Sequence, residues 1–535
     1  MPRHAKILRG VWPPFRRPVP AGWCAIAALA LVSPAVRAQR LVPEPVSNPG
    51  IAGFVFPESE ATVTGWITAM SRSGGTADGQ TAFEKIHLHG WGLWAEVTNE
   101  SAQSFEGQRL RVFETWPTPE DLASRPDLQS VAALGRQPRR RAPLHSLAQL
   151  DGRLAGTPAA SGLSGNPIDR VVGYVKLDPT AADHILKQGL FKTAALDALL
   201  QGGAQQIPAF PATALAAKSV FQVVRAADLV GGRYYGLKAW PGPPATVQEC
   251  GPAQWPGGVW IDVLDGGSGH GAVDDAFQAD GSTRTDETTY PLASLIHYRL
   301  SAGDATALNQ DKPGTNASAG DYAILVAMHI AGREIARWTW QTFWWTPAPD
   351  DPPAPSSAAI ANLRPPQLLG ATRHYAMALA YTMLTPDQPY VGGENSGAAV
   401  YAYNPWIEAA FRPADLPDSR AGFDPNGRPA ANNYGIQTNC MSCHAQANYN
   451  PNKLATAPRL TGARYVDLID PQFVGTLQVD FLWSIPHHAT SPTALVASPL
   501  VPAGDIAPPV PAVILPPRSR PSPLDPSQNL TFDQP

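Results

Sequence analysis

Between residues 219 and 345 the chain alternates between apolar segments and turns rich in Gly, Pro and Asp. Short runs of β-branched and aromatic residues bounded by such turns are typical of strands. The pattern therefore predicts an antiparallel, sandwich-like β-rich region. The expected strands are SVFQVVRAADL (219–229), GRYYGLKAW (232–240), GGVWIDVLD (257–265), LASLIHYRL (292–300), DYAILVAMHI (321–330) and EIARWTWQTFWW (334–345).

Helical spacing of apolar residues occurs in other parts of the chain. TAFEKIHLHGWGLWAEVTN (81–99) predicts one helix, and residues 178–203 predict a pair of helices that ends at a double glycine. HYAMALAYTML (374–384) predicts a further helix, whereas RLRVFETWPTPEDL (109–122) predicts a strand that ends at Pro117.

These segments together predict an α+β fold and four regions. Residues 1–38 form a signal peptide, and 39–357 form the β-rich domain with a few helices. A Pro-rich break at 346–357 separates it from a loop-rich, partly helical region, 358–489. Residues 490–535 are so rich in proline that we expect a flexible tail.

The N-terminus has the three parts of a secretory signal: a basic start, the apolar run AGWCAIAALALV (21–32) and small residues before Ala38. The run is shorter than the roughly 20 residues that span a bilayer. We therefore expect cleavage after Ala38, a periplasmic or secreted protein, and no stable membrane span in the mature chain. This segment holds six basic and no acidic residues, so its removal takes the formal net charge from −4 to −10. A protein this acidic lacks the clustered Lys and Arg that nucleic acid requires, which excludes that class of partner.

The most specific motif is Cys440-Met441-Ser442-Cys443-His444. A zinc ribbon needs a second pair of ligands, and a thioredoxin-like dithiol needs a βαβ context; the sequence shows neither. C-x-x-C-H in an exported protein is the attachment signature of haem c. The motif predicts that Cys440 and Cys443 bind one haem covalently and that His444 is the proximal ligand of its iron. Cys250 remains a single thiol, most simply buried and inert.

The sequence does not identify the second ligand of the iron. No Met follows Met441, so the downstream candidates are His487 and His488. Upstream candidates are Met377, Met383, Met328 and His329. Neighbouring residues in a strand point to opposite faces, so only one of Met328 and His329 can reach an iron. The position can also be vacant.

Two other patterns bear on a cofactor. Trp338, Trp340 and Trp344 share one face of the expected strand at 334–345, which predicts either a core face or a wall beside the haem or a substrate cleft. His87 and His89 match a copper ligand pair in spacing alone, because the chain has no His-Cys-His motif and the two side chains diverge on a helix.

The chain resembles a family of bacterial proteins described as cytochrome c family proteins. The resemblance rests on a segment around His329 and on a late N-C-M-x-C-H motif followed by a D-F-L-W stretch at 480–483. The shared positions of the first segment are His329, Ile330, Trp338, Trp340, Thr342 and Phe343. The resemblance implies one covalent haem at Cys440, Cys443 and His444, but no particular reaction. It favours His329 over the other candidates for the second ligand.

Two functions remain open from the sequence. The first is an exported mono-haem c-type cytochrome that transfers single electrons to or from a periplasmic redox partner or a small electron donor or acceptor. The second is a haem-dependent oxidoreductase, peroxidase-like or oxygenase-like, with an open distal side in the Trp-rich region. The long β-rich domain favours the enzyme, and the single C-x-x-C-H favours the carrier.

Overall fold

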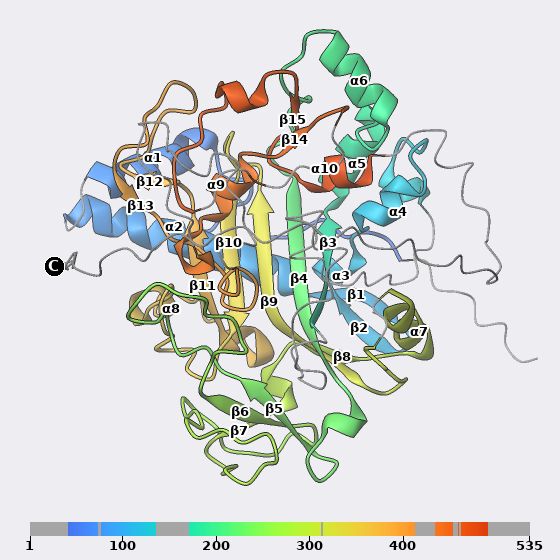
Figure 1. Cartoon of the computed structure of the whole chain (residues 1–535), viewed down its shortest axis with the longest axis vertical. Helices are drawn as coiled ribbons and strands as arrows, with labels where there is room; N and C mark the ends of the chain where they lie inside the picture. The colour runs from blue at the N-terminus through green and yellow to red at the C-terminus, as the bar shows by residue number, and fades with distance from the viewer. Residues whose placement is uncertain are drawn as a thin grey trace, which may run out of the picture. The chain divides into compact units, whose positions relative to one another are not determined.

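The computed structural model describes residues 41–72, 76–134, 171–311, 314–411, 434–452, 458 and 462–489. The predicted signal peptide and the predicted tail lie outside these residues. In the described part no helix is long and apolar enough to cross a membrane. The α+β class is confirmed, with helices and antiparallel sheets and a β-rich central region (Figure 1).

A six-stranded antiparallel sheet forms the centre of the fold. Five strands lie in the order β11-β10-β9-β4-β3. The sixth, β8, pairs with the first residues of β9, 322–324. The strands are β3 (Val171–Leu177), β4 (Leu215–Val224), β8 (His297–Arg299), β9 (Tyr322–Gly332), β10 (Thr339–Trp345) and β11 (Tyr375–Ala380). Almost every residue of β4, β9 and β10 is buried, so both faces of the sheet are covered.

Helix α2 (Ala77–Thr98) covers one face of this sheet. Thr76 caps its first turn by accepting a hydrogen bond from Gly79 N (3.3 Å). On the buried side of the helix, Trp94 stacks on Phe343 of β10 at 4.5 Å between ring centroids and contacts Tyr375 of β11 at 4.7 Å. Burying one such aromatic side chain stabilises the fold by roughly 2–3 kcal/mol. Figure 1 shows α2 (blue) passing behind the strands.

The opposite face of the sheet meets the C-terminal part of the described chain. Helix α9 (Cys440–His444) lies against β10, and α10 (Ser484–His488) follows it at the same end of the sheet (Figure 1). Strands β14 (Asn448–Tyr449) and β15 (Leu477–Gln478) pair between these two helices. This layer holds the predicted haem motif.

The remaining elements surround the sheet. Helices predicted at 81–99 and 178–203 are confirmed as α2 and as the pair α5 (Pro179–Gln188) and α6 (Thr193–Gln201). The other helices are α1 (Glu60–Arg72), α3 (Val112–Thr115), α4 (Pro119–Ala123), α7 (Ala302–Asp311) and α8 (Ala358–Ala361). The other strands are β1 (Glu100–Phe105), β2 (Gln108–Arg111), β5 (Tyr234–Lys238), β6 (Gly258–Asp262), β7 (Thr289–Pro291), β12 (Leu384–Thr385) and β13 (Ala398–Ala399).

Two of the predicted elements are wrong. Residues 375–380, expected to be helical, form β11, in which small side chains lie opposite the large ones of β10: Ala380 opposite Trp340 and Ala376 opposite Trp344. The Pro-rich segment 346–357 therefore connects two adjacent strands of one sheet. In 109–122 the strand ends at Arg111, where the Glu114 side chain accepts a hydrogen bond from Arg111 N (2.9 Å) and begins α3.

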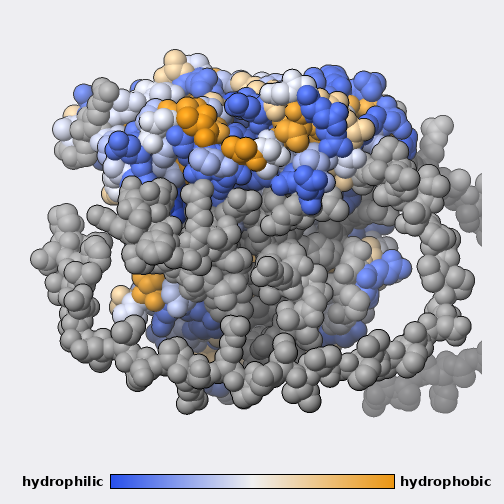
Figure 2. Space-filling view, turned by 45° about the horizontal axis from the view of Figure 1, so that its top comes forward, coloured by the Kyte–Doolittle hydropathy of each residue, from blue (hydrophilic) through white to orange (hydrophobic). Residues whose placement is uncertain are grey.

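The described surface in Figure 2 is mostly hydrophilic, with separate hydrophobic spots. The most exposed large apolar side chains include Val474 (81 %), Leu369 (72 %) and Leu264 (69 %). Singly exposed apolar residues are normal for a folded protein and require no binding partner. These exposed side chains therefore do not identify a functional site on the surface.

Candidate haem site

A cavity lies beside the sheet face that is opposite to α2. Its lining includes all three chemical groups of the sequence motif: the side chains of Cys440, Cys443 and His444. The fold therefore brings these three groups to one cavity.

Helix α9 is held at the cavity by its N-cap residue, Asn439, which is fully buried. Its side-chain oxygen accepts from Ser442 N (3.0 Å), and its side-chain nitrogen donates to the carbonyl oxygens of Thr382 (3.1 Å) and Val400 (2.7 Å). A buried amide with every group bonded fixes one orientation. The helix that carries both cysteines is therefore tied to the chain that follows β11.

Both cysteines are free thiols that burial keeps protonated. Burial, with the charge of Glu408, raises the pKa of Cys443 to about 12 and that of Cys440 well above its ordinary value. Reactive redox dithiols have lowered thiol pKa values, because the thiolate is the nucleophile. A thioredoxin-like role of this pair is therefore disfavoured by its surroundings as well as by its sequence context.

His444 is oriented by two contacts. Its Nδ1 lies 2.8 Å from the carbonyl oxygen of Phe481, and its ring packs on Trp340 of β10 at 4.1 Å between centroids. Because a carbonyl oxygen only accepts, Nδ1 carries the proton and Nε2 keeps its lone pair. Burial lowers the pKa of His444 to about 4, so the imidazole is neutral at pH 7. A neutral imidazole whose other nitrogen donates to a carbonyl has the form of a metal ligand.

The sheet supplies one wall of the cavity from two adjacent rows of cross-strand neighbours. One row places Ala216 of β4 and Ala331 of β9 beside Trp340 of β10, and both alanines leave space above them. The next row places Lys218 of β4 beside His329 of β9. Side chains two residues apart in a strand point to the same face. The polar pair therefore shares a face with the tryptophan that contacts His444.

Lys218, His329 and Glu408 form a half-buried cluster of charged and ionisable groups. His329 Nε2 donates to Glu408 Oε1 at 3.1 Å, and Glu408 Oε2 accepts from Asn404 N at 2.7 Å. Burial alone would raise the pKa of Glu408, but the charge and hydrogen bond of His329 outweigh it, and the pKa is lowered. His329, Lys218 and Glu408 also act on the pKa of His444, so the cluster lies near that imidazole.

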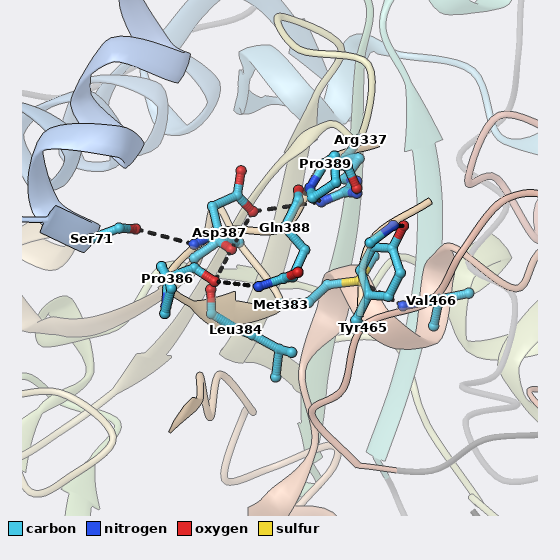
Figure 3. Close-up of polar contacts among 12 residues, drawn as sticks. Ser71, Arg337, Met383, Leu384, Pro386, Asp387, Gln388, Pro389, Tyr465 and Val466 are labelled. Carbon is cyan, nitrogen blue, oxygen red and sulfur yellow. Dashed lines mark hydrogen bonds and ion pairs between the residues drawn. The ribbon is translucent and has the colours of Figure 1, made fainter. Parts of the chain in front are cut away.

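The methionine candidates lie outside this cavity. Met328 points to the opposite face of β9 and is fully buried in the core beside α2, as strand alternation requires. Met377 lies where a side chain at Gly90 of α2 would meet its sulfur. Met383 Sδ accepts a hydrogen bond from Val466 N (3.3 Å), as Figure 3 shows. None of the three lines the cavity that contains His444.

The two downstream histidines do line the cavity, but differ in their bonds. Both ring nitrogens of His488 have partners: Ser484 O at 2.8 Å and Glu120 Oε1 at 3.0 Å. Nε2 of His487 is buried without a partner in the described part of the chain, and burial lowers the pKa of His487 to about 4. The charges that act on His487 are those of His488 and Lys218, and Lys218 also acts on the pKa of His444.

The Trp face predicted for 334–345 is only partly correct. Trp338 adopts a left-handed φ of 60°, which ends the alternation before β10 begins. Trp340 alone of the three lines the cavity. Its Nε1 donates to the carbonyl oxygen of Arg337 (2.9 Å). Trp344 lies on the same face of β10 as Trp340, as strand alternation requires, but packs in a core cluster outside the cavity lining. The remaining tryptophan, Trp338, donates to Asp480 Oδ1 at 3.3 Å.

Arg337 supports the chain behind this wall (Figure 3). Its buried guanidinium donates to the carbonyl oxygens of Gln388 (3.0 Å) and Pro389, and lies over the rings of Tyr390 and Tyr465, each 5.5 Å from its Cζ. Cation–π contacts of a desolvated guanidinium stabilise such packing by roughly 2 kcal/mol. Arg337 thereby joins the segments before and after α9 to the β9–β10 turn.

Two other sequence candidates are structural. On α2, His87 Nδ1 bonds to Phe83 O (2.7 Å), while His89 bonds to Tyr381 and Glu334, so the pair shares no site. Cys250 is buried, and burial raises the pKa of its thiol. Within the described ranges no group of three or more His, Cys, Asp or Glu side chains could hold a metal ion by itself.

Sequence reasoning missed Lys218, Glu408 and Asn439. Lys218 is the one charged residue inside the apolar stretch 214–224, and Glu408 follows the aromatic NPWI (404–407). A charged residue in a buried strand is itself a signal of function or of pairing. The cavity position of Glu408 depends on contacts between distant segments, which no local pattern contains.

Comparison with known proteins finds no match among family models, curated proteins or solved structures. The functional argument therefore rests on the residues of the cavity.

Proposed function

We propose that this chain is a mono-haem c-type cytochrome that exchanges single electrons with a redox partner. Cys440 and Cys443 would hold the haem through two thioether bonds, and His444 would bind its iron through Nε2. The observation that supports this proposal most directly is that all three side chains line one cavity. Nδ1 of His444 donates a hydrogen bond to Phe481 O, which leaves Nε2 unprotonated. We expect the mature protein in the periplasm or outside the cell, because of the predicted signal peptide.

The cavity residues fit a haem in three respects. The thiols are neutral and half-buried, and alanine and aromatic side chains supply an apolar wall. The imidazole is neutral, as ligation of iron requires. When bound, haem iron supplies a one-electron Fe(III)/Fe(II) couple, whose potential depends on the axial ligands, burial and nearby charge. The chain's own part is to fix the imidazole, exclude water and set that charge.

A haem-dependent oxidoreductase is a second candidate, which one observation favours. His329 Nε2 already donates to Glu408, and Met328 faces away from the cavity. Ligation of iron by His329 Nε2 would therefore cost a buried hydrogen bond to a carboxylate. If His487 does not bind the iron either, the iron would be open to a small molecule, with a proton donor and acceptor beside it.

The absorption spectrum of the haem-loaded protein tests both candidates. We expect a covalent haem that is reduced and reoxidised reversibly by one electron. A low-spin spectrum unchanged by carbon monoxide or cyanide indicates two protein ligands and the carrier. His329→Ala and His487→Ala variants then identify the second ligand, because only the correct variant becomes high-spin. A high-spin spectrum that shifts on adding either ligand indicates the oxidoreductase, and an absence of covalent haem contradicts both.

A further inference from the structure

Lys218 is a half-buried cation on the wall of the cavity. Its side chain lines the cavity from β4, and burial lowers the pKa of its ammonium. With the described residues Nζ forms no hydrogen bond and no ion pair within 4.0 Å. A half-buried ammonium has lost part of its hydration, so an anion in the cavity would stabilise it.

Among the described residues, the carboxylate whose charge acts on Lys218 is bonded to other groups. Glu408 is the acid whose charge acts on Lys218 and opposes the effect of burial on its pKa. Both oxygens of Glu408 are already used, Oε1 by His329 at 3.1 Å and Oε2 by Asn404 N at 2.7 Å. Asn404 is itself held in place, because its side chain donates to Thr342 Oγ1 (2.8 Å) and Phe343 O (2.9 Å). These bonds fix the position of the Glu408 carboxylate.

We propose that Lys218 binds a monoanionic oxygen group that lies inside the cavity. The shared chemistry is a carboxylate or a small oxyanion of similar size. It has two possible sources: a propionate group of the haem itself, or a free anion such as nitrite that enters beside the haem. The inference rests on the proposed haem site and extends it to a residue that the C-x-x-C-H motif does not contain.

The neighbours of Lys218 support an anion rather than a neutral ligand. The other ionisable groups that face it are His329 on β9, Glu408 on the segment after β13, His444 on α9 and His487 on α10. His329 lies directly opposite Lys218 in the β4–β9 register. Nδ1 of His329 is buried and has no partner in the described part of the chain. An anion beside Lys218 would therefore meet one full positive charge, and Nδ1 of His329 can donate to it when the imidazole is protonated.

The test compares the haem-loaded wild-type protein with Lys218→Met, Lys218→Arg and the control Lys238→Met. Met replaces a half-buried ammonium with an apolar side chain of similar shape, so we expect Lys218→Met to fold and to keep its haem. Lys238 is the matched control, since it is also partly buried, but it donates to Trp255 O (2.8 Å) outside the cavity. Nitrite and carbon monoxide are titrated into each protein, and the midpoint potential is measured against pH.

If the source is a free anion, Lys218→Met weakens nitrite binding at least tenfold and leaves carbon monoxide binding unchanged, because carbon monoxide has no charge. If the source is a haem propionate, nitrite binding does not change, but the pH-dependent step of the midpoint potential moves to higher pH. A carboxylate that loses its cation has a raised pKa. Lys218→Arg keeps the wild-type behaviour in either case.

The inference is overturned if Lys218→Met matches the wild-type protein and Lys238→Met both in nitrite binding and in the pH dependence of the midpoint potential. That result leaves the proposed haem intact, because each titration is read from the haem itself. A wild-type protein without covalent haem contradicts the proposed function instead, and the two failures are therefore distinct.

Discussion

Replacing Cys440 and Cys443 together by alanine should abolish covalent haem attachment, whereas Cys250→Ala should leave it unchanged. The first two thiols line the cavity with His444, and each is expected to form one thioether bond. Cys250 lies outside that lining, in the core cluster that includes Trp255. Covalent haem is measured as haem absorbance that stays with the chain after denaturation. The contrast separates a haem tether from a general need for buried thiols.

The single variants refine this result. With one thiol left, we expect a haem held by one bond and recovered in smaller amounts. If the double variant retains covalent haem, the attachment site is elsewhere and the assignment of the motif is wrong. Loss of haem in Cys250→Ala would instead point to a folding defect common to all cysteine variants.

Gly435→Ala should destabilise the fold by about 3 kcal/mol, the upper part of the range for overpacking. A Cβ at this position would lie 1.5 Å from the carbonyl oxygen of Glu408 and 2.5 Å from its carbonyl carbon. Backbone atoms cannot move away as a flexible side chain can. The segment that leads into α9 would have to separate from the segment that carries Glu408, and both line the cavity. Chemical denaturation measures the loss, and we expect lower haem content in parallel.

The matched control is Gly65→Ala in α1. A Cβ there meets nothing within 4 Å, and the residue is helical. Alanine is favoured over glycine in a helix by roughly 1 kcal/mol, so this variant should be slightly more stable than the wild type. Equal stabilities of Gly435→Ala and Gly65→Ala would show that the two segments do not pack as described.

Alternation and spacing predicted what depends on neighbouring residues. The alternation of side chains along a strand predicts that Met328 and His329 point to opposite faces, and the structure confirms this. The Cys-x-x-Cys-His spacing identified three side chains that line one cavity. These predictions needed no knowledge of which segments meet.

Predictions failed where tertiary packing decided the outcome. The alanine-rich segment of β11 has a strong helix propensity, but it lies opposite Trp340 and Trp344, which need small neighbours across the sheet. Lys218 and Glu408 belong to segments nearly 200 residues apart, and their cluster exists only through the β4–β9 register and the contacts of Asn404. No sequence pattern within either segment predicts that the two residues lie in the same cavity.

The central claim is tested most directly by the intact mass of the mature protein, produced in cells that attach haem c. We predict the mass of the chain from residue 39 onward plus one haem, and that mass should persist under denaturing conditions. The mass of the same polypeptide without haem would contradict the account, because the cavity would then have formed around Cys440, Cys443 and His444 for another purpose.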